Sequence, residues 1–240
     1  MKMTIQNAPI LHLDSYSGKT AMSILDSLLQ NRELICLDEI NADSAASLML
    51  QLKHLQEQDP KGEITIYINS PGGSLNDALA IYDVMRASTC PITTVCVGKA
   101  ASCGAILFAA GDTRKILPHS EVLIHDPFLR GGNGSATYEG LIDNFKMLAT
   151  CRETVADILA KHSGKSKEEI LEKTARETCF TAREAVEFGL ADCVIGNIDD
   201  APAQTKESKS EVVSSLEKET KAIPEIAAKE TINRKENSNE

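Results

Sequence analysis

The stretch VCVGKAASCGAILFAAG, from Val95 to Gly111, joins an apolar segment of strand type to an apolar segment of helix type. Small residues fill the junction between them and leave room for a second backbone or a ligand to approach. Ser102 begins the helical segment, where a serine has two uses. It can cap the helix by accepting a hydrogen bond from a following amide, or its hydroxyl can face a cleft as a nucleophile. The stretch taken alone favours the cap.

Outward from this junction, strand-like and helix-like segments alternate along the chain. We expect strands at 33–38, 63–69, 91–98, 121–125 and 191–196, and helices at 42–58, 75–88, 102–110 and about 138–162. The helix at 42–58 carries apolar residues at helical spacing behind a cap at Asp43 or Ser44. Such β-then-α alternation predicts an α/β domain with largely parallel strands.

Helix ends and turns are also marked in the sequence. Gly164 is expected to end the long helix that follows the glycine-rich segment 128–137. Two capping boxes, Ser166 with Glu169 and Thr181 with Glu184, open two further helices.

Composition places the chain in a reducing, aqueous compartment. The formal net charge of −10 over 240 residues argues against a nucleic-acid binder that relies on phosphate contacts. No apolar run approaches the ~20 residues that a membrane span needs, and the N-terminal residues do not resemble a secretory signal. Seven cysteines form no C-x-x-C pair, so we expect small buried residues rather than disulfides or a metal site. These features predict a cytoplasmic protein.

The chain is expected to divide into an N-terminal arm, a folded domain and a tail. The arm covers 1–16, the domain 17–197 and the tail 198–240. The tail has no aromatic residue and no glycine but ten acidic and seven basic residues, so it cannot bury enough apolar surface to order itself.

Three features within the domain indicate catalysis. The segment INSPGG, 68–73, follows a strand with glycines, so its amides can point into a site. Ser102 opens a helix, and His125 ends the strand in VLIHDP, at the end where α/β sheets commonly build their sites. Each feature alone has an ordinary structural explanation, as a turn, a cap and a hydrogen-bonded histidine.

The motifs YINSPGGS, GKAASCGAILFAAG, LPHSEVLIHDP and FTAREAVEFGLAD resemble, in order and spacing, those of the Clp protease proteolytic subunits. This resemblance covers about 17–195 and implies the α/β ClpP/crotonase-like fold of repeated β-α units, with a protruding strand-helix handle at about 126–163. It also implies a serine endopeptidase in which Ser102 is the nucleophile and His125 the general base. The amides of Gly73 and Cys103 correspond to the oxyanion hole of the family.

The resemblance further implies stacked rings, heptameric in the family, that degrade unfolded polypeptides delivered by a Clp/Hsp100-type AAA+ ATPase. The chain itself has no phosphate-binding loop, so ATP would be used only by that partner, and neither a cofactor nor a metal is expected. No nucleic acid and no membrane are expected as partners.

Three departures from the family pattern leave alternatives open. Glu177 stands where the third catalytic residue of the family is an aspartate; the adjacent Asp126 is a weaker rival, because neighbouring strand side chains point to opposite faces. Arg176 is present, but its usual acidic neighbour is Ala175. The arm and the tail also differ from the family.

The alternatives are therefore a catalytically impaired subunit in a mixed ring with an active paralogue, and a phage-type ClpP-like maturation peptidase. An acyl-CoA enzyme of crotonase fold is the weakest alternative, because it does not need the Ser/His pair.

Overall fold

A mostly parallel sheet forms the framework of the domain in the computed structural model, which describes residues 10–15, 18–129 and 137–196. In these ranges the sheet has seven strands: β3 (Glu33–Ile40), β4 (Ile64–Gly73), β5 (Ile92–Ala101), β6 (Thr113–Ile116), β7 (Glu121–Ile124), β8 (Thr178–Thr181) and β9 (Cys193–Val194). Every strand pair in it is parallel except β7 with β8. The predicted α/β class with largely parallel strands is confirmed.

One edge of the long strand β5 pairs with β4. Its other edge has a different neighbour along each half of its length. Its first half pairs with β6 from Thr93 to Cys96, and its second half pairs with β7 from Lys99 to Ala101. The two halves meet at Gly98, whose φ of 87° only glycine adopts at low cost. β5 therefore carries the chain away from β6 and delivers Ala101 beside β7.

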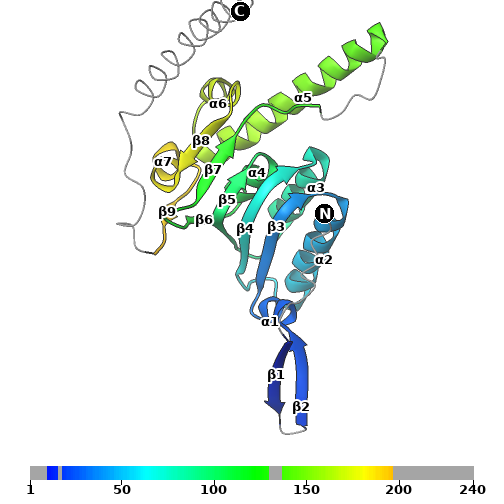
Figure 1. Ribbon diagram of the computed structural model, residues 1–240, viewed down its shortest axis with the longest axis vertical. Helices are drawn as coiled ribbons and strands as arrows, with labels where there is room; N and C mark the ends of the chain where they lie inside the picture. Colours follow the sequence, from blue (N-terminus) through cyan, green and yellow to red (C-terminus); the bar gives the residue numbers. More distant parts are fainter. Residues whose placement is uncertain (1–9, 16–17, 130–136, 197–240) are drawn as a thin grey trace, which may run out of the picture. The chain divides into compact units, whose positions relative to one another are not determined.

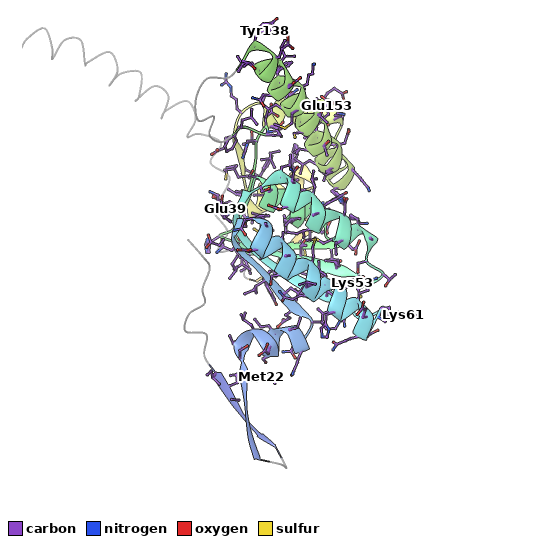
Figure 2. The ribbon with its side chains drawn as sticks, turned by 90° about the vertical axis from the view of Figure 1, so that its right-hand side faces the viewer. Met22, Glu39, Lys53, Lys61, Tyr138 and Glu153 are labelled. Atoms are coloured by element: carbon purple, nitrogen blue, oxygen red, sulfur yellow. The ribbon has the colours of Figure 1, made fainter. Side chains whose placement is uncertain are left out.

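Seven helices surround the sheet in the described part of the chain: α1 (Ile24–Gln30), α2 (Ala42–Gln58), α3 (Leu75–Ala87), α4 (Cys103–Ala109), α5 (Tyr138–Ser163), α6 (Lys167–Thr174) and α7 (Ala182–Phe188). The views in Figures 1 and 2 place α2 and α3 side by side over β3 and β4. All residues of α4 are buried, and this helix contacts β4, β5, α3 and α5. The centre of the core is therefore the helix that begins just after Ser102.

The core contains the apolar residues that the helical spacing selects. Ala45, Leu48, Leu52 and Leu55 form the buried face of α2, while Met49 is only partly buried. Four of the seven cysteines are buried, Cys151 is half-buried, and Cys179 and Cys193 are exposed; all seven are free thiols. The prediction of buried, unpaired cysteines therefore holds for four positions and is wrong for the two exposed ones, which lie on the short strands β8 and β9.

Several element ends match the prediction and others do not. Gly164 ends α5 in a left-handed conformation, and both predicted capping boxes are present at the starts of α6 and α7. At α2, however, the cap is Asn41, whose side chain accepts from the amides of Asp43 and Ser44. The predicted caps at Asp43 or Ser44 are wrong because the helix already begins at Ala42, so the capping position is Asn41.

An antiparallel hairpin near the N-terminus was not predicted. β1 (Ile10–Ser15) pairs with β2 (Gly18–Ser23), and Ser23 then caps α1. The predicted end of the arm, residue 16, lies in the sequence between β1 and β2, and residues 16–17 are outside the described ranges. The predicted tail, 198–240, and part of the handle, 130–136, also lie outside the described residues.

Candidate active site

Strand pairing brings Ser102 and His125 to the same edge of the sheet. Ala101, the last residue of β5, is in register with Leu123 of β7, and the Ser102 amide donates to the Leu123 carbonyl at 2.8 Å. His125 follows the end of β7 by one residue. The two segments, about twenty residues apart in sequence, thus end together because β5 and β7 run parallel.

The backbone of Ser102 is held in a rare conformation. Its φ of 55° and ψ of −121° lie outside the helical and extended regions, which costs a non-glycine residue about 1–3 kcal/mol. The bond to Leu123 on one side and the helical bonds from Ala105 and Ile106 to its carbonyl on the other maintain this conformation. The surrounding structure therefore over-determines the position of Ser102.

The Ser102 side chain does not cap α4. Ser102 occupies the residue before the helix, but its hydroxyl accepts no hydrogen bond from the first turn. By contrast, Ser74, Thr137, Ser166 and Thr181 each accept such a bond at the starts of α3, α5, α6 and α7. The structure therefore removes the ordinary explanation for a serine at this position.

The glycine turn at the end of β4 touches Ser102 directly. A Cβ atom placed on Gly72, whose φ is 95°, would lie 2.7 Å from Ser102 Cβ and 2.8 Å from the Ala101 carbonyl oxygen. A Cβ atom on Gly73 would lie 2.1 Å from the Ile40 carbonyl oxygen. The segment predicted as a turn is here the last part of β4, and it needs both glycines to fit between β3 and Ser102.

His125 is oriented by a backbone carbonyl. Its Nδ1 lies 2.6 Å from the carbonyl oxygen of Asp126, and its ring packs against Phe128 with centroids 5.4 Å apart. Because a carbonyl oxygen can only accept, Nδ1 carries the proton. Nε2 is then the ring nitrogen with a free lone pair, which is the form of imidazole that can act as a base.

A cavity of about 390 Å³ is lined by both Ser102 and His125. Ser102 and His125 lie on its wall together with Gly73, Ser74 and Glu39. The remaining lining is mostly apolar: Pro71, Leu75, Cys103, Ile106, Ile124, Pro127, Phe128, Val155 and Leu159. An apolar pocket with a few convergent polar groups is the usual form of a small binding site, and here it lies beside the serine–histidine pair.

The amides assigned to an oxyanion hole border the same cavity. Cys103 is the first residue of α4, so its amide has no acceptor within the helix, and Gly73 ends β4 across from it. The Cys103 thiol donates to the Gly73 carbonyl at 3.4 Å, and burial raises the pKa of this thiol above its ordinary value. Gly73 and Cys103 thus both line the cavity, and the Cys103 thiol stays protonated at neutral pH.

Glu177 lies near His125 in the strand register but is not bonded to it. The last pair of the β7–β8 ladder is Ile124 with Thr178, so His125 and Glu177 each lie one residue beyond that pair. Both are described residues, and neither a hydrogen bond nor an ion pair joins them; the Glu177 side chain is exposed. The pKa of Lys99 is raised mainly by its hydrogen bond to Glu121 and more weakly by the charge of Glu177.

Asp126, the weaker rival for the third position, uses its carboxylate elsewhere. One carboxylate oxygen accepts from Arg152 Nε at 2.7 Å and the other accepts from Thr174 Oγ1 at 2.6 Å. The role of Asp126 toward His125 falls to its carbonyl, which the sequence analysis did not consider. Every residue has a backbone carbonyl, so the sequence does not indicate which one contacts His125. The sequence also does not indicate that Arg152 and Thr174 are the partners of the Asp126 carboxylate.

The neighbouring departure from the family pattern, Ala175, and the retained Arg176 are both on the surface. Ala175 and Arg176 are exposed and follow the end of α6. The structure shows no ion pair of Arg176 with any other described residue.

Residues 16–198 match the Clp protease family. The chain belongs to the Clp protease family. It is 40% identical over 188 residues to "ATP-dependent Clp protease proteolytic subunit 2" of Cutibacterium acnes (strain DSM 16379 / KPA171202). The aligned part covers 76% of this chain and 87% of that protein.

Family membership decides the class of reaction. The chain is a proteolytic subunit of Clp protease type, and its chemistry is that of a serine peptidase, a hydrolase of peptide bonds. The α/β fold of the domain agrees with this assignment. The family match includes the β4 turn, the start of α4, the end of β7 and the segment before β8, so every residue considered above lies within it.

The described ranges contain neither a cluster suited to a metal ion nor a helix suited to span a membrane. No group of three or more His, Cys, Asp or Glu side chains there could hold a metal ion. In the same ranges, no helix has both the length and the apolar content to cross a membrane.

Proposed function

We propose that this Clp protease subunit is a serine endopeptidase in which Ser102 is the nucleophile and His125 the general base. One observation carries the assignment. The Ser102 hydroxyl, which makes no capping bond, shares a cavity with a histidine whose Nδ1 proton is engaged and whose Nε2 is left as an acceptor. A nucleophile and an oriented base in one apolar pocket is the arrangement that acyl transfer requires.

The proposed reaction proceeds through an acyl-enzyme. His125 Nε2 removes the Ser102 proton as Oγ bonds to the carbonyl carbon, and the C=O electron pair moves onto oxygen. The amides of Gly73 and Cys103 donate to that oxyanion. Collapse breaks the C–N bond, His125 gives its proton to the leaving amine, and water activated by His125 then releases the acid product.

The lining of the cavity favours an apolar side chain next to the bond that is cut. Ile106, Val155 and Leu159 are buried residues from α4 and α5 that form part of this wall, and burying a leucine-sized group there gains about 1.5–3 kcal/mol. We therefore expect short fluorogenic peptides with leucine before the scissile bond to be cut faster than their aspartate counterparts.

We propose a reduced role for Glu177. Glu177 and His125 each lie one residue beyond the last pair of the β7–β8 ladder, so the Glu177 carboxylate contributes negative charge that favours the imidazolium, while orientation of the ring comes from the Asp126 carbonyl. Because an exposed charge is screened by water and salt, Glu177→Gln should lower turnover by less than about tenfold. A fall of 10²-fold or more would instead indicate that Glu177 bonds to His125 in the working enzyme, as the aspartate does in the family.

Self-assembly into stacked rings, heptameric by family resemblance, is part of the proposal. Tyr138, Leu141 and Phe145 lie on one face of α5 at spacings of three and four residues, and their side chains are 76%, 56% and 74% exposed. The buried residues of α5 are all in its second half, toward Ser163. An apolar face on the first half fits a second copy of the chain, because leaving it in water is unfavourable.

A partner ATPase completes the proposed assembly. The name of the Cutibacterium relative includes ATP dependence, and this chain has no phosphate-binding loop of its own. We propose that a Clp/Hsp100-type ring ATPase delivers unfolded polypeptide to the chamber, that the subunit itself holds no cofactor, and that it acts in the cytoplasm.

Purification with a paired assay tests the function. The assembly mass, peptide cleavage and fluorophosphonate labelling should be measured in the same fractions. Ser102→Ala should remove labelling and cleavage but keep the assembly mass, because it deletes one hydroxyl. Undiminished cleavage by this variant would overturn the assignment.

Two observations favour one second candidate, an impaired subunit that supports a mixed ring with an active paralogue: Glu177 is exposed and does not bond to His125, and Ala175 stands where the family has an acidic residue. It predicts that the purified chain labels slowly alone and that co-expression with the paralogue gives rings containing both chains.

A further inference from the structure

We propose that Asp126, Arg152 and Thr174 form a positioning network for His125, acting through the Asp126 carbonyl. The inference rests on the proposed role of His125 as base. It adds polar side chains from α5 and α6 to a site whose proposed nucleophile and base lie at the ends of β5 and β7.

Every other polar group of Asp126 is engaged. Its amide donates to the Thr174 carbonyl at 2.8 Å. Its carboxylate accepts from the Thr174 hydroxyl at 2.6 Å and from Arg152 Nε at 2.7 Å. With these three bonds in place, the remaining group is the carbonyl, which accepts from His125 Nδ1 at 2.6 Å.

The partners of Asp126 are themselves fixed. Thr174 is 2% exposed and ends α6, and Arg152 also reaches the Leu171 carbonyl of that helix at 3.4 Å. The ion pair between Arg152 and Asp126 is only partly shielded, with side chains 36% and 31% exposed. A pair of this kind contributes little to overall stability, so its main effect is to restrict where the Asp126 peptide group lies.

The restriction matters to the reaction for two reasons. A carbonyl at Nδ1 selects the tautomer with Nε2 free, and it stabilises the imidazolium that forms when the Ser102 proton is taken. The ring orientation is also set, and small misplacement of a reacting group is costly. The network should therefore act on turnover more than on substrate binding.

Thr174 offers the cleanest perturbation, because Val has nearly the same shape and lacks the hydroxyl. Thr174→Val should lower kcat about tenfold with KM within about twofold of the parent. The acid limb of the kcat/KM profile should move to lower pH by about half a unit, because the imidazolium loses support from a well-placed acceptor. Thr174→Ser restores the hydroxyl and should recover both. Asp126→Ala should give the larger loss, up to about a hundredfold.

The other charged groups around His125 stay in place in these Thr174 variants. They are Glu39, which lines the same cavity, Arg152 from α5, and Glu177, which lies just before β8. A shift of the acid limb in Thr174→Val therefore reports on the Asp126 carbonyl rather than on a changed charge.

Lys167→Gln is the matched control. Lys167 joins the same two helices through Glu153 and Asp157 of α5, at 2.7 Å each, without contacting Asp126. If the network acts only by holding α5 against α6, this variant should mimic Thr174→Val. We expect it to keep the parental kcat and pH profile.

The outcomes separate this proposal from the function it rests on. Parental kcat and pH profile in both Thr174→Val and Asp126→Ala overturn the network while Ser102→Ala still defines the enzyme. Equal effects in Lys167→Gln overturn it too. If the parent does not cleave peptides, the tautomer of His125 is read instead from ¹⁵N spectra of histidine-labelled protein, with the signal assigned by its loss in His125→Asn. Support then requires Nδ1 protonation in the parent and a mixture in Thr174→Val, and an unchanged tautomer refutes the network.

Discussion

A methyl group on Gly72 should disable the proposed nucleophile without touching it chemically. In Gly72→Ala the new Cβ would lie 2.7 Å from Ser102 Cβ, 2.8 Å from the Ala101 carbonyl oxygen and 3.0 Å from the Cys103 amide nitrogen. Two of these three atoms are backbone, so they cannot rotate away. Ser102 must therefore shift with the start of α4.

The size of the shift follows from the contact distances. Moving the contact of Ser102 Cβ from 2.7 Å to an ordinary 3.4 Å displaces that atom by about 0.7 Å. Misplacement of about 1 Å in a reacting group can cost about 10²-fold in rate, so we expect kcat to fall about ten- to a hundredfold. The φ of 95° at this residue adds backbone strain of about 1–2 kcal/mol to the loss in unfolding free energy.

Gly164→Ala is the control that separates the steric clash of an added Cβ atom from the backbone strain of a positive φ. Gly164 also has a positive φ, 71°, but nothing lies within 4 Å of an added Cβ atom there. This variant should lose about 1 kcal/mol in stability and keep its turnover.

The assay is peptide turnover per fluorophosphonate-reactive site, measured beside thermal unfolding of each variant. Parental turnover per site in Gly72→Ala would refute the view that this glycine supports Ser102. An equal loss in Gly164→Ala would refute the steric explanation.

Two further predictions follow from the described side chains. His162 Nε2 and the Tyr82 hydroxyl form a hydrogen bond of 3.1 Å. Burial of the ring, together with the nearby charge of Arg86, lowers the pKa of His162 to about 4. In the unfolded chain His162 has its ordinary pKa of 6.5, so it binds a proton at a higher pH than it does in the folded protein. The free energy of unfolding should therefore decrease as the pH falls from about 6.5 toward 4. Urea unfolding of the parent and His162→Gln across this range checks it, and equal slopes for the two proteins would exclude His162 as the cause. The second prediction concerns the exposed apolar face of α5. Phe145→Asp places a charge on this face, so sedimentation should give an assembly mass about half that of the parent, while Lys146→Asp should leave the mass unchanged. A parental mass for Phe145→Asp would show that this face is not part of the docking surface.

Local physics made much of the fold readable from the sequence. The apolar spacing of 42–58 gives the helix α2 with the bounds predicted, and Gly164 and the two capping boxes end or open helices where expected. These signals depend on hydrogen bonds within a few residues, so the chain carries them without tertiary help. The hairpin β1–β2 was not predicted, because each strand is stabilised by hydrogen bonds to the other and not by bonds within a few residues.

The site divides along the same line. Ser102, His125 and the glycines of β4 stand out as residue types at characteristic positions, and the resemblance to the family gives them roles. Whether Ser102 caps a helix, however, depends on a φ of 55° that is imposed by the Leu123 carbonyl from another strand. A sequence cannot state that choice, because both uses of serine need the same residue at the same place.

The partner of His125 is the clearest case of a feature that only the tertiary structure decides. The sequence offers two carboxylates, Glu177 and Asp126, and favours the one in the family register. In the structure Glu177 is exposed, the Asp126 carboxylate is bonded to Arg152 and Thr174, and the Asp126 carbonyl accepts from His125. A carbonyl is present at every residue, so only the packing of α5 and α6 against the end of β7 determines which one meets the imidazole ring.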